Sequence, residues 1–221
     1  MFAAHVTPHI AFAGFAGSAL FNGTAQLMVP YQTVQFGSGD YTVEFWAYIT
    51  THTTQWIQFL GQWGTYQVFQ FSVLNDVVAT QTSSGVRSSG SPYWVGSWKF
   101  LAYTRSGGVS FVYINGTRYS LSGSDAGITA TSSCAIGIGR VVDQGGYGLV
   151  GNLNGVRITS GVARYTGTTM TVPTAPHPVG SNDPFWSSVQ LLLPLDVDGT
   201  DLSSFGRSVT NSGVTFSSLH P

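Results

Sequence analysis

WKFLAYTRSGGVSFVYINGTRY, residues 98–119, contains two runs rich in β-branched and aromatic residues that flank Arg105-Ser106-Gly107-Gly108. The second run ends in Asn115-Gly116. Glycine pairs and Asn-Gly pairs between such runs are typical of tight turns that join antiparallel strands. Apolar and polar residues alternate within the runs, as expected for strands with one buried face. The stretch therefore predicts a meander of antiparallel strands.

Turn residues recur along the chain at intervals of about 8–15 residues, and helix patterns are nearly absent, which is typical of a β-sandwich. Tyr41–Ile49 has the strongest strand pattern: its odd-numbered residues form an apolar face and are expected in the core. Its even-numbered residues form a mixed face, which predicts either a solvent-facing concave surface or a second packing layer. The expected strands are Ala19–Phe21, Leu27–Val29, Tyr41–Ile49, Trp56–Leu60, Tyr66–Leu74, Val77–Thr82, Lys99–Thr104, Ser110–Ile114, Ala135–Ile138 and Leu153–Thr159.

Three blocks together resemble a known family: residues 98–119, GSGDYTVEFWAY at residues 37–48 and GNLNGVRITSGVARYTG at residues 151–167. They are similar to laminin-G-like domains of the concanavalin A-like lectin/glucanase superfamily, in the form common in bacteriophage structural proteins. The resemblance covers residues 15–178 and implies an all-β fold, an antiparallel jelly-roll β-sandwich. It says less about function, because this sandwich hosts lectins, hydrolases and passive adhesion modules.

The resemblance divides the chain into a laminin-G-like sandwich, residues 1–178, and a C-terminal extension, residues 179–221. Within the extension, QLLLPLDVDGTD at residues 190–201 resembles the opening strands of the family, although here it follows the rest of the domain. A circular permutation would let the extension complete its own sandwich, and this is the first expectation because the apolar run needs a sheet to bury it. The alternatives are exchange of these strands with a neighbouring copy and the start of a lost second repeat.

Only 8% of the 221 residues are charged, against roughly 25% in an average soluble domain. The net charge is −1 and the arginines are scattered, so no basic stripe is available for nucleic acid. No run is expected to insert into a membrane, and the N-terminal segment lacks the basic start of a signal peptide. A weakly charged surface favours a subunit covered by neighbours in an assembly. Cys134 has no possible intramolecular disulfide partner and is expected to be a buried structural thiol.

Catalysis is not expected. Glu44 is the sole glutamate and has no acidic neighbour in its strand, whereas retaining glycosidases use two carboxyl groups about 5–5.5 Å apart. The resemblance would place an acidic pair near Asn154-Gly155, where this chain has neither acid. Glu44 is therefore predicted to be structural and to pair with Arg157 or Arg105.

No metal and no cofactor are expected. Asp196 to Asp201 offer three carboxylates in six residues but lack the ligand spacing and terminal glutamate of an EF-hand loop. Asp143 has no second acid near it in the sequence.

Glycan binding requires aromatic platforms beside planar polar side chains, and two parts of the sequence provide them. One is the run from Trp56 to Tyr66, with Gln58 and Gln62; the other combines Tyr93-Trp94 with the loop at residues 143–147. Rings of this kind are equally common in cores and at protein interfaces. The candidate carbohydrate-binding residues are Trp56, Trp63, Tyr66, Tyr93, Trp94, Asp143 and Tyr147.

The resemblance, taken with the weakly charged surface and the missing carboxylate pair, implies a non-enzymatic structural protein of a phage virion, assembled in the host cytoplasm. It would decorate the capsid or form part of a tail or fibre, and its partners would be other virion proteins, copies of itself and host surface glycans. A secreted carbohydrate-binding module or lectin is the first alternative, and a glycoside hydrolase is the second.

Overall fold

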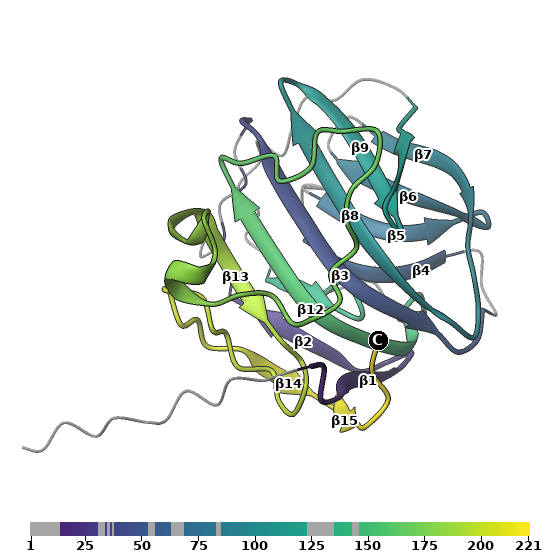
Figure 1. The fold of residues 1–221 in the computed structure, drawn as a ribbon. Helices are drawn as coiled ribbons and strands as arrows, with labels where there is room; N and C mark the ends of the chain where they lie inside the picture. Colours follow the sequence, from purple (N-terminus) through teal and green to yellow (C-terminus); the bar gives the residue numbers. More distant parts are fainter. Residues whose placement is uncertain are drawn as a thin grey trace, which may run out of the picture.

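The chain folds into two antiparallel β-sheets packed face to face (Figure 1). The computed structural model describes residues 14–30, 34, 36, 38–52, 56–62, 69–82, 85–122, 135–142 and 146–221. Within these ranges, helix is confined to two short 3-10 turns, η1 (Gly180–Asn182) and η2 (Trp186–Ser188), and neither has the length needed to cross a membrane. The predicted all-β jelly-roll sandwich is confirmed.

Sheet 1 has the strand order β10-β9-β8-β3-β12-β1-β15, and β13 also pairs with β12. Its strands are β1 (Ser18–Asn22), β3 (Tyr41–Ile49), β8 (Trp98–Ser106), β9 (Val109–Ile114), β10 (Thr117–Ser120), β12 (Val150–Ser160), β13 (Val189–Leu193) and β15 (Thr215–Ser217). Sheet 2 has the order β14-β2-β11-β4-β5-β6-β7. Its strands are β2 (Gln26–Val29), β4 (Trp56–Gln62), β5 (Phe69–Leu74), β6 (Val77–Thr82), β7 (Gly85–Pro92), β11 (Ile136–Ile138) and β14 (Thr210–Ser212).

The predicted meander is β8, β9 and β10. Gly107 and Gly108 join β8 to β9 with φ angles of 56° and 84°, and Asn115 and Gly116 join β9 to β10 with φ angles of 47° and 84°. Two consecutive positive φ angles define the type I′ hairpin turn, which Asn and Gly adopt at least cost. These turns fix the registers of β8 with β9 and of β9 with β10, and the other edge of β8 pairs with β3, the strand at the centre of the site.

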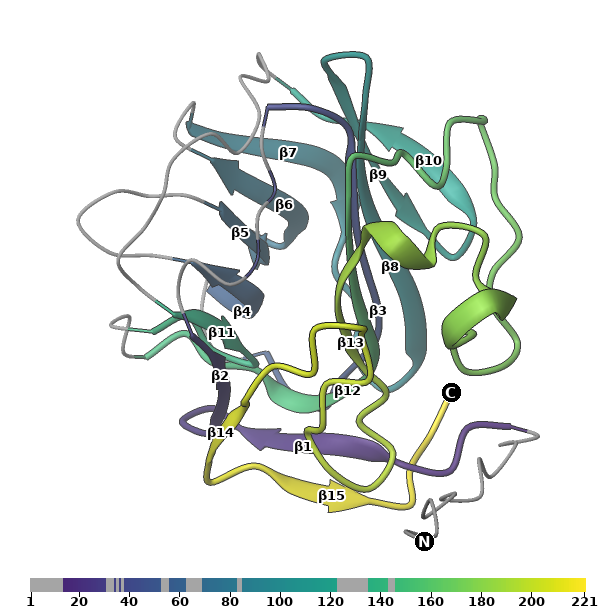
Figure 2. The ribbon, with the colours of Figure 1, turned by 90° about the vertical axis from the view of Figure 1, so that its left-hand side faces the viewer.

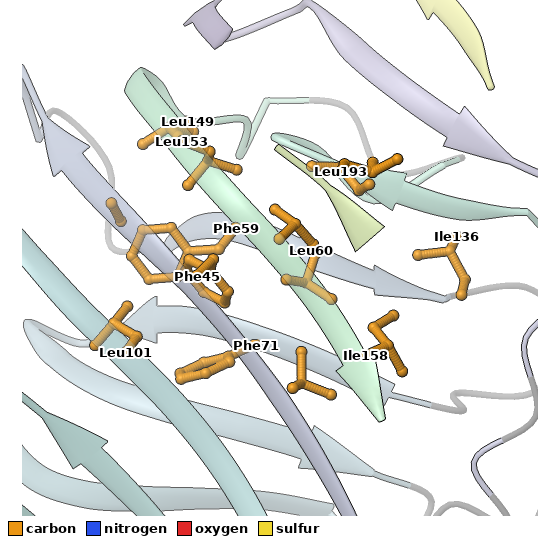
Figure 3. Close-up of a cluster of buried hydrophobic side chains, with 14 of the residues drawn as sticks. Phe45, Phe59, Leu60, Phe71, Leu101, Ile136, Leu149, Leu153, Ile158 and Leu193 are labelled. Carbon is orange, nitrogen blue, oxygen red and sulfur yellow. The ribbon is translucent and has the colours of Figure 1, made fainter. Parts of the chain in front are cut away.

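The odd-numbered residues of β3 have no exposed surface and form the middle of the core, as predicted. The Phe45 ring lies 5.4 Å from Phe59 and 5.1 Å from Phe71, centroid to centroid, so β3 of sheet 1 packs directly on β4 and β5 of sheet 2 (Figure 3). The opposite face of β3 is also covered. Of the two alternatives for that face, the structure has the second packing layer.

The C-terminal extension contributes to both sheets (Figure 2). β13 pairs with β12, β14 with β2, and β15 with β1. Asn154 of β12 ties these parts together, because its side-chain amide donates to the Gly17 carbonyl at 2.8 Å and to the Asp196 carboxylate at 2.9 Å. Gly17 lies so close to the Asp196 carbonyl that a Cβ atom would overlap it. These contacts lie within one chain; exchange of the strands between copies stays a prediction.

Candidate functional site

The even-numbered face of β3 carries a buried polar cluster centred on Glu44. Arg157 Nε of β12 lies 2.7 Å from one carboxylate oxygen of Glu44, and the Tyr165 hydroxyl donates to the other at 2.5 Å. Asp183 is bound by two guanidinium groups, that of Arg157 at 2.9 Å and that of Arg164 at 2.8 Å. The cluster therefore balances two carboxylates against two arginines.

The predicted pairing of Glu44 is confirmed for Arg157. Strand pairing places Arg157 directly opposite Glu44 on the same face of sheet 1. Arg105 points to the other side, where its guanidinium donates to the Gly39 carbonyl at 3.0 Å, so the alternative pairing with Arg105 is wrong. The physical reason is the two-residue period of β8, which turns Arg105 inward together with Tyr103.

A segment that we call the strap, residues 161–188 between β12 and β13, covers this face of sheet 1 and crosses in front of β8 and β3 in Figure 1. It is fixed at its middle, where Met170 N donates to the Gly116 carbonyl at 2.9 Å, and at the cluster through Arg164, Tyr165 and Asp183. His177 lies against Phe100, and its Nε2 is 2.9 Å from the Gly155 carbonyl. Apolar strap residues cover the Phe100 and Tyr113 rings, so the part of the sheet face that carries these rings and Glu44 is sealed from solvent.

The electrostatics of the cluster oppose acid catalysis. Burial pushes the pKa of the Glu44 carboxyl upward, but Arg157 and Arg164 outweigh burial and hold that pKa below its usual value. Burial and the Glu44 carboxylate raise the pKa of Tyr165. Burial and Arg157 lower the pKa of His177 to about 4, so the imidazole is neutral at neutral pH. A glycosidase general acid needs the reverse, a carboxyl group whose pKa is raised.

A second carboxylate lies near Glu44 after all. Glu44 has no acidic neighbour in its own strand, but Asp183 of the strap binds the same Arg157 guanidinium. Both carboxylate side chains are completely buried, and the guanidinium occupies the position between them. This arrangement neutralises the two charges and leaves no room for a glycosidic bond between them.

The candidate carbohydrate-binding residues that the structure describes lie at one end of the sandwich. Trp56 at the start of β4 packs against Tyr147, with ring centroids 5.4 Å apart. The loop that carries Tyr147 is fixed to β4, because Gln58 N donates to the Tyr147 carbonyl at 2.8 Å. Tyr147 is 39% exposed and Trp56 is partly exposed, so the pair presents aromatic surface to solvent.

Tyr93 reaches the same end from the β7–β8 connection. Its backbone N–H donates to the Asp76 carbonyl at 2.9 Å, and Asp76 belongs to the turn after Leu74, the residue that pairs with Trp56. The Tyr93 ring lies 4.2 Å from the His52 ring, and His52 Nδ1 is 3.4 Å from the Asp76 carboxylate. We call His52, Trp56, Tyr93 and Tyr147 the aromatic rim.

The remaining candidates divide into two groups. Trp94 stacks on Phe59 with centroids 6.1 Å apart and packs against the core, so it supports the rim rather than forming a platform. The other candidates lie outside the described residues, as does the predicted structural thiol Cys134. These candidates are Trp63, Tyr66 and Asp143.

The carboxylates of the acidic run at residues 196–201 mainly accept hydrogen bonds from the protein itself. The Asp196 carboxylate accepts from Asn154, and the Asp201 carboxylate accepts from the backbone N–H groups of Leu192, Ser203 and Arg207. Asp198 alone points to solvent. The described part of the chain contains no cluster of three or more His, Cys, Asp or Glu side chains that could bind a metal ion.

Sequence reasoning missed four members of the Glu44 cluster. Arg164, Tyr165, His177 and Asp183 all belong to the strap, which has no periodic pattern. The available signal was composition. The strap carries one arginine, Arg164, and one aspartate, Asp183, in a chain with few charges, and such charges need partners when they are buried.

Two antiparallel sheets packed face to face define the class of the protein, a jelly-roll β-sandwich. The sequence model of the concanavalin A-like lectin/glucanases superfamily, in its laminin G form, matches residues 21–164, and the chain belongs to this family. A search of curated proteins finds no match.

Three solved structures are similar in fold. A proposed carbohydrate binding protein from Bacteroides ovatus has a TM-score of 0.72 at 19% identity; the match covers 94% of this chain but only 61% of the Bacteroides chain. The heptameric SAP-like pentraxin from Limulus polyphemus has a TM-score of 0.62 at 16% identity, over 93% of this chain and 96% of the pentraxin. Domains LG4-5 of the mouse laminin alpha1 chain have a TM-score of 0.51 at 11% identity; the match covers 75% of this chain and 48% of the laminin chain.

Proposed function

We propose that the protein acts by binding and not by catalysis, with carbohydrate contacted at the aromatic rim. The observation that carries this proposal is the sealed state of the Glu44 face: its carboxylates are bound by Arg157 and Arg164 and covered by the strap. In the part of the chain that the structure describes outside the C-terminal extension, the rim carries an exposed ring, that of Tyr147, packed on the partly exposed Trp56, and the exposed Asp76 carboxylate contacts His52 of the same rim.

Sugar rings bind to proteins through apolar C–H faces and through hydroxyl groups at their edges. The Trp56–Tyr147 pair offers a flat apolar surface, and the tyrosine hydroxyl and the Asp76 carboxylate offer hydrogen-bonding groups. The lectin-like family and the described role of the Bacteroides ovatus protein support carbohydrate as the ligand class.

We further propose that the protein is a structural component of a phage virion, assembled in the host cytoplasm as a capsid decoration or a tail or fibre part. The support is the resemblance of residues 37–48, 98–119 and 151–167 to domains of phage structural proteins, together with the 8% charge content. So few charges give little repulsion between copies, which suits a subunit that works against neighbours. Detection of the protein in purified particles tests this role; its absence from them would favour a free lectin.

The rim is tested by replacing Tyr147 with alanine, alone and together with Trp56→Ala. We expect glycan affinity to fall about tenfold or more, because aromatic anchors are the usual hot spots of binding. Binding is measured on a glycan microarray and then by calorimetry with the best ligand. Val109→Ala is the matched control, because Val109 is an exposed apolar residue of β9, beside the β8–β9 turn. Unchanged affinity in the double variant would exclude the rim as the glycan site.

A further inference from the structure

The C-terminal extension forms a pocket of about 490 Å³ that is separate from the aromatic rim. The pocket lies beside β14 and β15, the edge strands of the two sheets, which are drawn in yellow in Figure 2. Its volume is within the range of about 300–1,000 Å³ in which proteins bind small molecules. Its lining residues are Leu27, Asp198, Gly199, Thr200, Asp201, Gly206, Arg207, Val209, Asn211 and Phe216.

Most polar groups of the pocket are already engaged. The Asn211 side chain bonds both backbone groups of Val214, at 2.8 and 3.0 Å, and the Asp201 carboxylate accepts backbone N–H groups on both of its oxygens. The Arg207 guanidinium donates to the Gln190 carbonyl and lies 3.8 Å from Asp201. These contacts make the wall of the pocket rigid and electrically balanced.

Asp198, Thr200 and Asn211 are the exposed polar residues of the lining, and the Asn211 side chain is the one bonded to Val214. One oxygen of Asp198 accepts the Thr200 backbone N–H at 2.9 Å, and a carboxylate has about four acceptor positions in all. The Thr200 hydroxyl can both donate and accept. A ligand in the pocket therefore meets a strong acceptor and a hydroxyl side by side.

The apolar side chains of the lining are Leu27, Val209 and Phe216. Val209 and Phe216 are partly exposed and give the pocket its apolar surface, whereas Leu27 is fully buried behind them. Phe205 is not itself a lining residue, but it is 52% exposed and its ring centroid lies 4.2 Å from the guanidinium carbon of Arg207, which lines the pocket. An aromatic ring exposed to this extent adds little to folding. It is available to pack against a ligand that rests on Arg207.

We propose that this pocket binds a neutral sugar ring and is a second carbohydrate site of the protein. Apolar lining next to an exposed carboxylate and hydroxyl matches a pyranose, which has C–H faces and a rim of hydroxyl donors and acceptors. The single uncompensated charge, on Asp198, disfavours acidic sugars. Deep burial of a whole oligosaccharide is not required, so the pocket accepts a free monosaccharide or the end of a chain.

The test is an NMR titration of the full chain with the methyl glycosides of glucose, galactose and mannose, followed at the amides of Gly199 and Gly206. We expect at least one glycoside to shift both resonances, and Asp198→Ala and Phe205→Ala each to weaken that binding at least fivefold. Asp76→Ala removes the exposed carboxylate of the rim. This variant is expected to leave glycoside binding in the pocket unchanged. An oligosaccharide ending in the same sugar is expected to produce the same shifts.

The outcomes separate this site from the rim. Shifts that survive both Asp198→Ala and Phe205→Ala, or that are confined to rim residues such as Tyr147, overturn the pocket but leave the rim proposal standing. No shift at Gly199 and Gly206 with any of the three glycosides also overturns it. Binding abolished by raised salt would contradict a neutral ligand. Unchanged melting temperatures of the two variants, expected because Asp198 and Phe205 are exposed, exclude misfolding as the cause of lost binding.

Discussion

Replacing Glu44 with glutamine is expected to lower the free energy of unfolding by about 3–5 kcal/mol, the usual cost of breaking a buried ion pair from one side. The variant leaves Arg157 and Arg164 with Asp183 as their remaining carboxylate and weakens the bond from the Tyr165 hydroxyl. Urea or guanidinium unfolding followed by tryptophan fluorescence measures the change.

Asp76→Asn is the matched control for Glu44→Gln. Its carboxylate side chain is 70% exposed, so the substitution is expected to change stability by less than about 0.5 kcal/mol. If Glu44→Gln changed the free energy of unfolding as little as Asp76→Asn does, the Glu44 cluster would not be the contact that holds the strap on sheet 1.

Deleting residues 189–221 is expected to make the protein insoluble. The deletion removes β13, β14 and β15 and uncovers the edges of β12, β2 and β1, together with core residues such as Ile158 and Leu27. Open edges beside apolar surface pair with other chains and aggregate. The soluble fraction after expression and size-exclusion chromatography measure the effect.

Removing only His220 and Pro221 is the control for this deletion, because neither residue belongs to a strand. That shortened chain is expected to remain soluble. A soluble 1–188 protein with an unchanged melting temperature would show that the extension is a dispensable tail and not part of the sandwich.

The fold was predictable because its signals are local. The turns at Gly107-Gly108 and Asn115-Gly116 and the two-residue period of residues 41–49 are visible in the sequence, and the structure has them as expected. The Glu44–Arg157 pair could also be predicted, because the two residues lie on strands that the resemblance places in one sheet. β7 (Gly85–Pro92) was missed, since an edge strand rich in serine and glycine has no apolar alternation.

The site was less predictable because it depends on contacts between distant segments. Asp183 and Tyr165 reach Glu44 through the strap, whose path follows from packing on Phe100 and Tyr113 and not from its own sequence pattern. At the rim, Trp56 and Tyr147 belonged to two separate groups of candidates. The backbone pairing of Gln58 with the Tyr147-Gly148 segment, which the sequence does not reveal, brings them together.

The most direct test of binding without catalysis is the release of reducing ends from the polysaccharides that the purified protein binds. The sealed Glu44–Asp183 cluster predicts no release above that of the buffer, at any pH at which the protein is folded. Steady release at a rate proportional to the concentration of purified protein would contradict the account and identify the protein as a hydrolase.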